Sequence, residues 1–138
     1  MDKAESVNQT GPQDIIAAKI VLIVEDEFLL RHTIATYFRD AGCVVVEAES
    51  AEQAMTMCHG GTPVDILITD IQLGGPGSGW DVAAAFRSLW KMMPVIYTSG
   101  RVRDRTRSVP NSLFIDKPYR LSDIMNACQR LLVSAGSS

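Results

Sequence analysis

The sequence lacks three features that would each have assigned it to a broad class. It has no apolar run close to the roughly 20 residues that a membrane-spanning helix needs. Its 13 basic residues do not outnumber its 16 acidic ones, and a net charge of −3 argues against direct nucleic-acid binding through bulk electrostatics. Its three cysteines are odd in number and lack metal-ligand spacing, so we expect reduced thiols in a cytoplasmic protein.

The N-terminal stretch MDKAESVNQTGPQD has neither the basic start nor the apolar centre of a secretory signal. Its polar residues predict a flexible tail over residues 1–18. A chain of 138 residues with 46% hydrophobic residues has the size and core of about one domain. We therefore expect a single domain over residues 19–134, followed by a short C-terminal tail at 135–138.

Five short apolar runs alternate with helical patterns along this domain. The runs are nearly continuous, as in parallel strands covered on both faces. The helical patterns cover residues 28–41, 50–58, 80–90 and 121–133, and the strands cover residues 19–24, 44–48, 65–70, 94–99 and 113–117. The alternation predicts an α/β fold with a doubly wound, flavodoxin-like parallel sheet in the strand order 2-1-3-4-5.

The fourth connection differs from the others. From Gly100 to Pro110 it reads GRVRDRTRSVP, with little apolar periodicity and a proline at its end, which predicts a short or irregular fourth helix. Its four arginines, Arg101, Arg103, Arg105 and Arg107, indicate either a solvated face or a surface for a partner.

Polar residues follow four of the predicted strands, at the edge where open parallel sheets bind ligands. Carboxylates with a hydroxyl and an ammonium group suit a divalent cation such as Mg²⁺ together with a phosphoryl group. One carboxylate can act as a nucleophile and form an acyl phosphate. In chain order these residues are Glu25 and Asp26, then Asp70, then Ser99, then Lys117.

The chain over residues 19–133 resembles the receiver domain of two-component response regulators. The resemblance rests on four features in this order: an acidic pair, a lone Asp, a Ser with a small residue after it, and a Lys-Pro pair. The resemblance implies a phospho-accepting protein that receives its phosphoryl group from a sensor histidine kinase or a histidine phosphotransfer protein. It implies signalling to a downstream protein by conformational change, and catalysis of no reaction beyond its own phosphorylation and dephosphorylation. It leaves homodimerisation open.

The resemblance also implies a role for each site residue. Asp70 would be the phosphoacceptor, and Glu25 and Asp26 would hold Mg²⁺ with it. The backbone carbonyl of Gln72 would complete the protein's share of the metal ligands. Ser99, rather than the adjacent Thr98, would bind a phosphoryl oxygen, because Gly100 then fills the small-residue position.

Four further residues take roles from the same resemblance. Lys117 would pair with a phosphoryl oxygen, and Pro118 would follow a cis peptide bond. Phe114 matches the aromatic switch position, although an ordinary core Phe is the alternative. Arg101, with Gln72, occupies a position that tunes the lifetime of the phosphoryl group, and we predict that Arg101 slows self-dephosphorylation.

Two departures from the usual family pattern stand out. The stretch IQLGGPGSGW after Asp70 is glycine-rich and long, and because it lacks the Lys-Ser/Thr ending of a phosphate-binding loop we expect a flexible connection. The spacing from Ser99 to Lys117 is short for a receiver, which resembles the FATGUY subgroup. That match is loose, since Val102 stands in place of the final tyrosine of the motif.

Three alternatives share some of this chemistry. A phosphate sink would accept the phosphoryl group without any output. A phosphatase of the haloacid dehalogenase type also uses an Asp nucleophile and Mg²⁺, but it needs a second Asp where this chain has Gln72, and it has no place for the acidic pair. A degenerate receiver would lack an acid or the lysine, and none is missing here.

Overall fold

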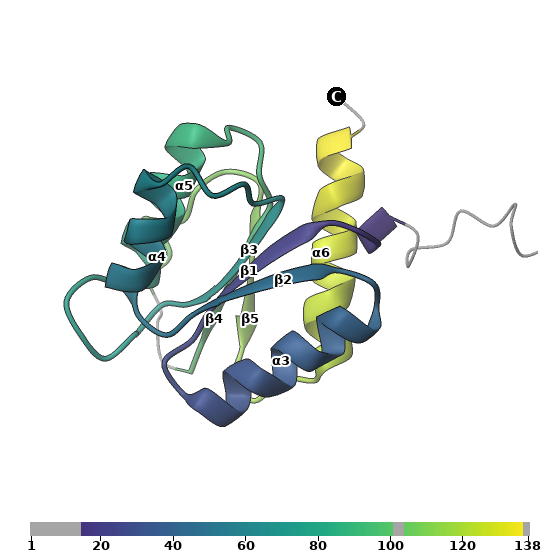
Figure 1. Cartoon of the computed structure of the whole chain (residues 1–138), viewed down its shortest axis with the longest axis horizontal. Helices are drawn as coiled ribbons and strands as arrows, with labels where there is room; N and C mark the ends of the chain where they lie inside the picture. Colours follow the sequence, from purple (N-terminus) through teal and green to yellow (C-terminus); the bar gives the residue numbers. More distant parts are fainter. Residues whose placement is uncertain (1–14, 101–103, 137–138) are drawn as a thin grey trace, which may run out of the picture.

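The computed structural model describes residues 15–100 and 104–136. Five strands form one parallel sheet in the order β2-β1-β3-β4-β5, as the sequence predicts (Figure 1). The strands are β1 (Ile20–Val24), β2 (Val44–Ala48), β3 (Ile66–Asp70), β4 (Val95–Ser99) and β5 (Ser112–Asp116). The strands β1 and β3 are therefore neighbours although β2 separates them in sequence, and their carboxyl ends meet at the same edge.

Within the described residues four helices cover the two faces of the sheet. They are α3 (Phe28–Asp40), α4 (Ala51–His59), α5 (Gly79–Leu89) and α6 (Leu121–Gly136). Figure 1 shows α4 and α5 together on one face and α3 and α6 together on the other. Each pair encloses its own core, with Leu67, Phe86 and Tyr97 on the first side and Phe38 and Ile68 on the second.

The central strands explain why the apolar runs are continuous. Every residue of β3 and of β4 is buried. In the sheet register Leu67 lies beside Leu22 of β1 on one side and beside Val95 of β4 on the other. Side chains on both faces of these strands are therefore mostly apolar, because helices cover both faces, and the buried polar residues stand toward the carboxyl ends of the strands.

The fourth connection has no helix within residues 104–111, where the backbone forms turns. This confirms the predicted irregular connection for the described part. The phenol oxygen of Tyr97 accepts a hydrogen bond of 3.2 Å from the backbone N–H of Val109. Side-chain contacts of this kind hold the connection against the sheet. At the other crossovers between strands, a packed helix takes this place.

Most of the predicted tail, residues 1–14, lies outside the described residues, but two observations concern the residues next to the predicted domain bounds. Ile16 is fully buried in the core under α3 and α6, and the N–H of Ala18 donates to the carbonyl of Gly42 at 2.9 Å. The chain therefore joins the domain before residue 19, because an apolar side chain at position 16 adds to the core rather than to a tail. At the other end α6 continues to Gly136, past the predicted boundary at 134. None of the helices in the described ranges is long and apolar enough to cross a membrane.

Candidate functional site

Three carboxylates meet where β1 and β3 end. Glu25 and Asp26 follow β1, Asp70 is the last residue of β3, and one oxygen from each lies within 4.8 Å of the others. The parallel pairing of the two strands brings these side chains together although Asp70 stands 44 positions after Asp26 in the sequence. The convergence predicted at the strand ends is thus present.

The three carboxylates differ in exposure. Glu25 is 3% exposed and Asp70 is 7% exposed, whereas Asp26 is open to solvent. Burial, helped by the charge of Asp70, raises the pKa of Glu25 to about 7, against the lowering effects of a 3.0 Å hydrogen bond from the backbone N–H of Glu27 and of the charge of Lys117. Glu27 itself is the N-cap residue of α3, without a side-chain capping bond, and it lies outside the cluster.

Lys117 supplies the positive charge of the site. Its Nζ lies 2.9 Å from Oδ2 of Asp70 and 3.6 Å from Oε1 of Glu25. Burial alone would lower the pKa of Lys117, but the hydrogen bond and charge of Asp70 together with the charge of Glu25 outweigh it, and the pKa is raised. The peptide bond from Lys117 to Pro118 is cis, as the resemblance implies.

The backbone next to Asp70 and Lys117 completes the local geometry. The N–H of Gln72 donates to Oδ1 of Asp70 at 3.2 Å, so each carboxylate oxygen of Asp70 accepts a hydrogen bond. Ser99 is 2% exposed at the end of β4, and its carbonyl accepts from the N–H of Lys117 at 2.9 Å. Gln72 and Ser99 thus border the site, while their roles toward a metal and a phosphoryl group stay predictions. Arg101 lies outside the described residues.

Phe114 lies in an aromatic cluster rather than alone in the core. Its ring centroid is 5.1 Å from that of Tyr97 and 5.6 Å from that of Trp80. The guanidinium of Arg105 covers the ring at 4.1 Å. The ring is half-buried, so its environment is compatible with both interpretations that the sequence leaves open, a switch residue and a core residue.

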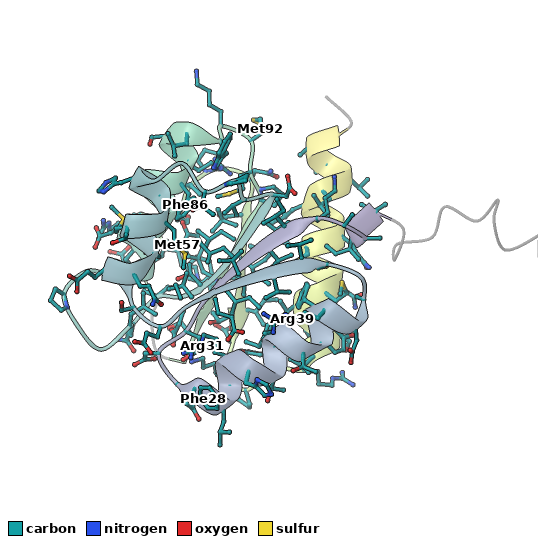
Figure 2. The ribbon with its side chains drawn as sticks, in the orientation of Figure 1. Phe28, Arg31, Arg39, Met57, Phe86 and Met92 are labelled. Carbon is teal, nitrogen blue, oxygen red and sulfur yellow. The ribbon has the colours of Figure 1, made fainter. Side chains whose placement is uncertain are left out.

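Arg31 is a site residue that the sequence reasoning missed. It donates to the backbone carbonyl of Glu25 at 2.8 Å and to Oε1 of Glu47 at 3.1 Å, and so ties the end of β1 to β2. Figure 2 shows Arg31 beneath the sheet, whereas Phe28, which is 60% exposed, lies at the outer end of the same helix. Helical spacing in the sequence could have identified Arg31 as a buried residue, because it shares the buried face of α3 with Ile34 and Phe38.

Tyr119 is a second residue that the motifs do not reveal. Its hydroxyl is buried and has no hydrogen-bond partner within the described ranges. Burial raises the pKa of this phenol, and the charges of Glu25 and Asp70 raise it further.

The donor set fits a hard divalent cation. Three carboxylates face one ammonium group, so the charges at the site do not balance. Mg²⁺ binds through one or two carboxylates while it keeps several of its waters, and the exposed Asp26 leaves a side of the cluster open to water. Glu25, Asp26 and Asp70 are therefore the residues that would hold the ion.

Comparison with known proteins gives one consistent family. The response regulator receiver domain matches residues 21–129. The transcriptional regulatory protein PhoP of Escherichia coli (strain K12) is 30% identical over 116 residues, covering 81% of this chain and 51% of PhoP. PdtaR of Mycobacterium tuberculosis is 30% identical over 127 residues, covering 87% of this chain and 61% of PdtaR. The chain thus spans about half the length of PhoP.

Solved structures agree with this assignment. The crystal structure of a response regulator receiver protein from Sinorhizobium medicae aligns with a TM-score of 0.81 and 30% identity, over 86% of this chain and 97% of that one. A receiver domain protein from Methanospirillum hungatei, at 17% identity and a TM-score of 0.77, shares the fold. With a family match over most of its length and the strand order and acidic cluster described above, this chain belongs to the response regulator receiver domains of two-component signalling.

Proposed function

We propose that this protein accepts a phosphoryl group from a phosphohistidine onto Asp70. The observation that carries the proposal is the position of Asp70, with Nζ of Lys117 at 2.9 Å and an oxygen of each member of the acidic pair within 4.8 Å. A nucleophile close to a cation and to a set of metal-binding oxygens has the surroundings that phosphoryl transfer needs, since that reaction depends mainly on positioning and charge neutralisation.

In the proposed step an Asp70 oxygen forms a bond to phosphorus while the bond from phosphorus to the donor's imidazole nitrogen breaks. The nitrogen takes up a proton and leaves as neutral histidine. Lys117 stays at hydrogen-bonding distance and offsets charge on the transferred group. Ser99 donates its hydroxyl to a phosphoryl oxygen, and Arg31 keeps the end of β1 in place through the carbonyl of Glu25.

Mg²⁺, when bound by Glu25, Asp26 and Asp70, supplies further positive charge to the phosphoryl oxygens. The carbonyl of Gln72 is the proposed fourth protein ligand. The carboxylates would thus hold the ion, and the ammonium of Lys117 would offset charge on the phosphoryl group together with it.

We further propose that the phosphorylated protein acts in the cytoplasm through contacts with a downstream protein partner, and that it catalyses no reaction other than its own phosphorylation and dephosphorylation. The phosphoryl donor would be a histidine kinase or a histidine phosphotransfer protein. A phosphatase of the dehalogenase type is disfavoured because Gln72, two residues after Asp70, offers no carboxylic acid.

The test is intact-mass measurement after incubation with a small acyl phosphate and Mg²⁺. We expect one added phosphoryl group, which is lost with Asp70→Asn and with a chelator. Asp40→Asn is the matched control, because Asp40 is an exposed aspartate at the end of α3 and outside the cluster. An unmodified parent protein, or equal modification of Asp70→Asn, would overturn the proposal.

A further inference from the structure

Apart from Gln72, the glycine-rich connection over residues 71–78 has no role in the chemistry above, yet both of its ends are fixed. At its end the N–H of Gly79 donates to the carbonyl of Ile71 at 2.9 Å, which closes the connection into a loop. Ser78 and Asp81 then form a capping box at the start of α5. The connection expected to be flexible is therefore a loop with a defined base, which we name the glycine loop.

The middle of the glycine loop lies against one of the three carboxylates. A Cβ added to Gly74 would lie 2.9 Å from Oδ2 of Asp26, closer than real Cβ atoms approach an oxygen. Gly74 also has φ of +77°, a conformation that L-residues rarely adopt. The backbone of Gly74 thus lies so close to the carboxylate of Asp26 that a side chain at position 74 does not fit between them.

The loop cannot relieve such a contact by moving back. Leu73, the residue before Gly74, is 5% exposed and packs in the core under α4 and α5. Farther along, a Cβ on Gly77 would lie 3.0 Å from Cβ of Ala51, so the loop already rests on the first residue of α4. A side chain at position 74 would therefore displace Asp26, whose exposed carboxylate is the part that can move.

We propose that Gly74 is a positioning residue for Asp26, and that its lack of a side chain lets this carboxylate keep its place beside Glu25 and Asp70 for cation binding. This inference rests on the proposed function, since it assumes that Asp26 is a ligand of Mg²⁺. It assigns to the glycine loop the task of forming one wall of the metal site.

The test compares Mg²⁺ affinity, measured by calorimetric titration, among three variants. Gly74→Ala adds the Cβ that meets Asp26, and outer contacts to metal ligands typically change affinity by at least about tenfold. Gly75→Ala is the matched control, because no atom lies within 4 Å of its added Cβ and no unfavourable φ applies. Gly61→Ala carries a comparable φ of +75° in open space, and so measures the backbone strain without the contact.

We expect Gly74→Ala to weaken Mg²⁺ binding at least about tenfold while Gly75→Ala and Gly61→Ala bind like the parent. If Gly74→Ala does not fold, Gly74→Asn keeps the Cβ and adopts positive φ more readily, and the same loss is expected. Parent-like affinity in the folded Gly74 variant would overturn this inference alone. A parent protein that binds no Mg²⁺ would instead overturn the proposed function on which it rests.

Discussion

The loops that follow β3 and β4 reach the same edge of the sheet but are held there by opposite means. The glycine loop lies close to its neighbours because Gly74 and Gly77, and Gly79 directly after the loop, have no side chain at the points of approach. The connection over residues 104–111, here named the arginine loop, is held by the side chains that it carries. One loop therefore depends on shape and the other depends largely on charge.

The contacts of the arginine loop are exposed. Arg105 covers the ring of Phe114 and pairs with Asp116 at 3.2 Å. Arg107 pairs with Asp81 of α5 at 2.9 Å. About half of each arginine side chain is open to solvent, where ion pairs contribute little and salt screens them. Salt does not screen van der Waals contacts between closely packed atoms. We therefore expect substitutions in and next to the glycine loop to change stability more than substitutions in the arginine loop.

The largest expected effect is at the base of the glycine loop. In Gly79→Ala the added Cβ would overlap the backbone carbonyl oxygen of Asp70 and lie 2.9 Å from Cα of Ile71. Backbone atoms at the end of a central strand cannot give way, so we expect a loss of at least about 3 kcal/mol in the free energy of unfolding. Urea denaturation measures it, with Gly75→Ala as the control; an unchanged midpoint for Gly79→Ala would contradict the close approach.

Glu25→Gln tests whether charge matters more where it is buried. The folded-state pKa of Glu25 is about 7 against an ordinary 4.5, so the native state binds its proton more tightly and the parent loses stability as the pH rises from about 4.5 through 7. In chelator at pH 8 we expect the variant to be more stable than the parent by about 2 kcal/mol, less than the whole shift because Gln gives up the attraction of Lys117.

The difference between Glu25→Gln and the parent should fall toward zero at pH 4, since both side chains are then neutral. Thermal melting at a series of pH values provides the measurement. A constant difference from pH 4 to pH 8 would show that Glu25 does not titrate in this range.

Arg105→Ala probes the side-chain contacts of the second loop. It removes the cation–π contact with Phe114 and the ion pair with Asp116, and we expect a loss of about 1 kcal/mol in stability. Arg105→Lys keeps the charge but not the flat stacking surface, and so should recover part of the loss. Tryptophan emission, measured during denaturation, follows the transition through Trp80 in the same cluster. Equal stability of Arg105→Ala and the parent would mean that this contact contributes nothing.

The smallest expected effect is at Arg107→Ala. The hydrogen bond from Arg107 lowers the pKa of Asp81, so the stability from this pair is present above the ordinary carboxyl pKa and is lost as the pH falls. Both side chains are about half exposed, and we expect a loss of about 0.5 kcal/mol at neutral pH. Raising the salt concentration should shrink the difference, whereas a difference that persists in high salt would indicate a contact of shape rather than of charge.

The sequence predicted the sheet because its signals are local and repeated. Each buried strand is an apolar run, and the strand order follows from the alternation with helices. The same order brought Asp26 and Asp70 together without further information. The helix expected from residue 80 begins at Gly79 in the structure, where Ser78 and Asp81 form a capping box that the sequence analysis does not single out.

The parts that sequence reasoning missed depend on contacts between distant segments. Gly74 reads as one more loop glycine, and its approach to Asp26 appears once β1 and β3 are placed side by side. Arg31 reads as a surface arginine until its hydrogen bond to the carbonyl of Glu25 is known. The sequence places Ile16 in a tail because the stretch before residue 15 is polar, whereas the burial of Ile16 is decided by Cys43 and its other neighbours in space.

The first turn of α5 joins the two loops mechanically. Gly79 rests against the carbonyl of Asp70, and two residues later Asp81 holds Arg107 of the arginine loop. A contact of packed atoms can push but cannot pull, whereas an ion pair resists separation. The end of β3 therefore blocks motion of α5 toward it through steric contact. Motion of α5 in the opposite direction is restrained instead by the hydrogen bond to Ile71 and by the ion pair with Arg107.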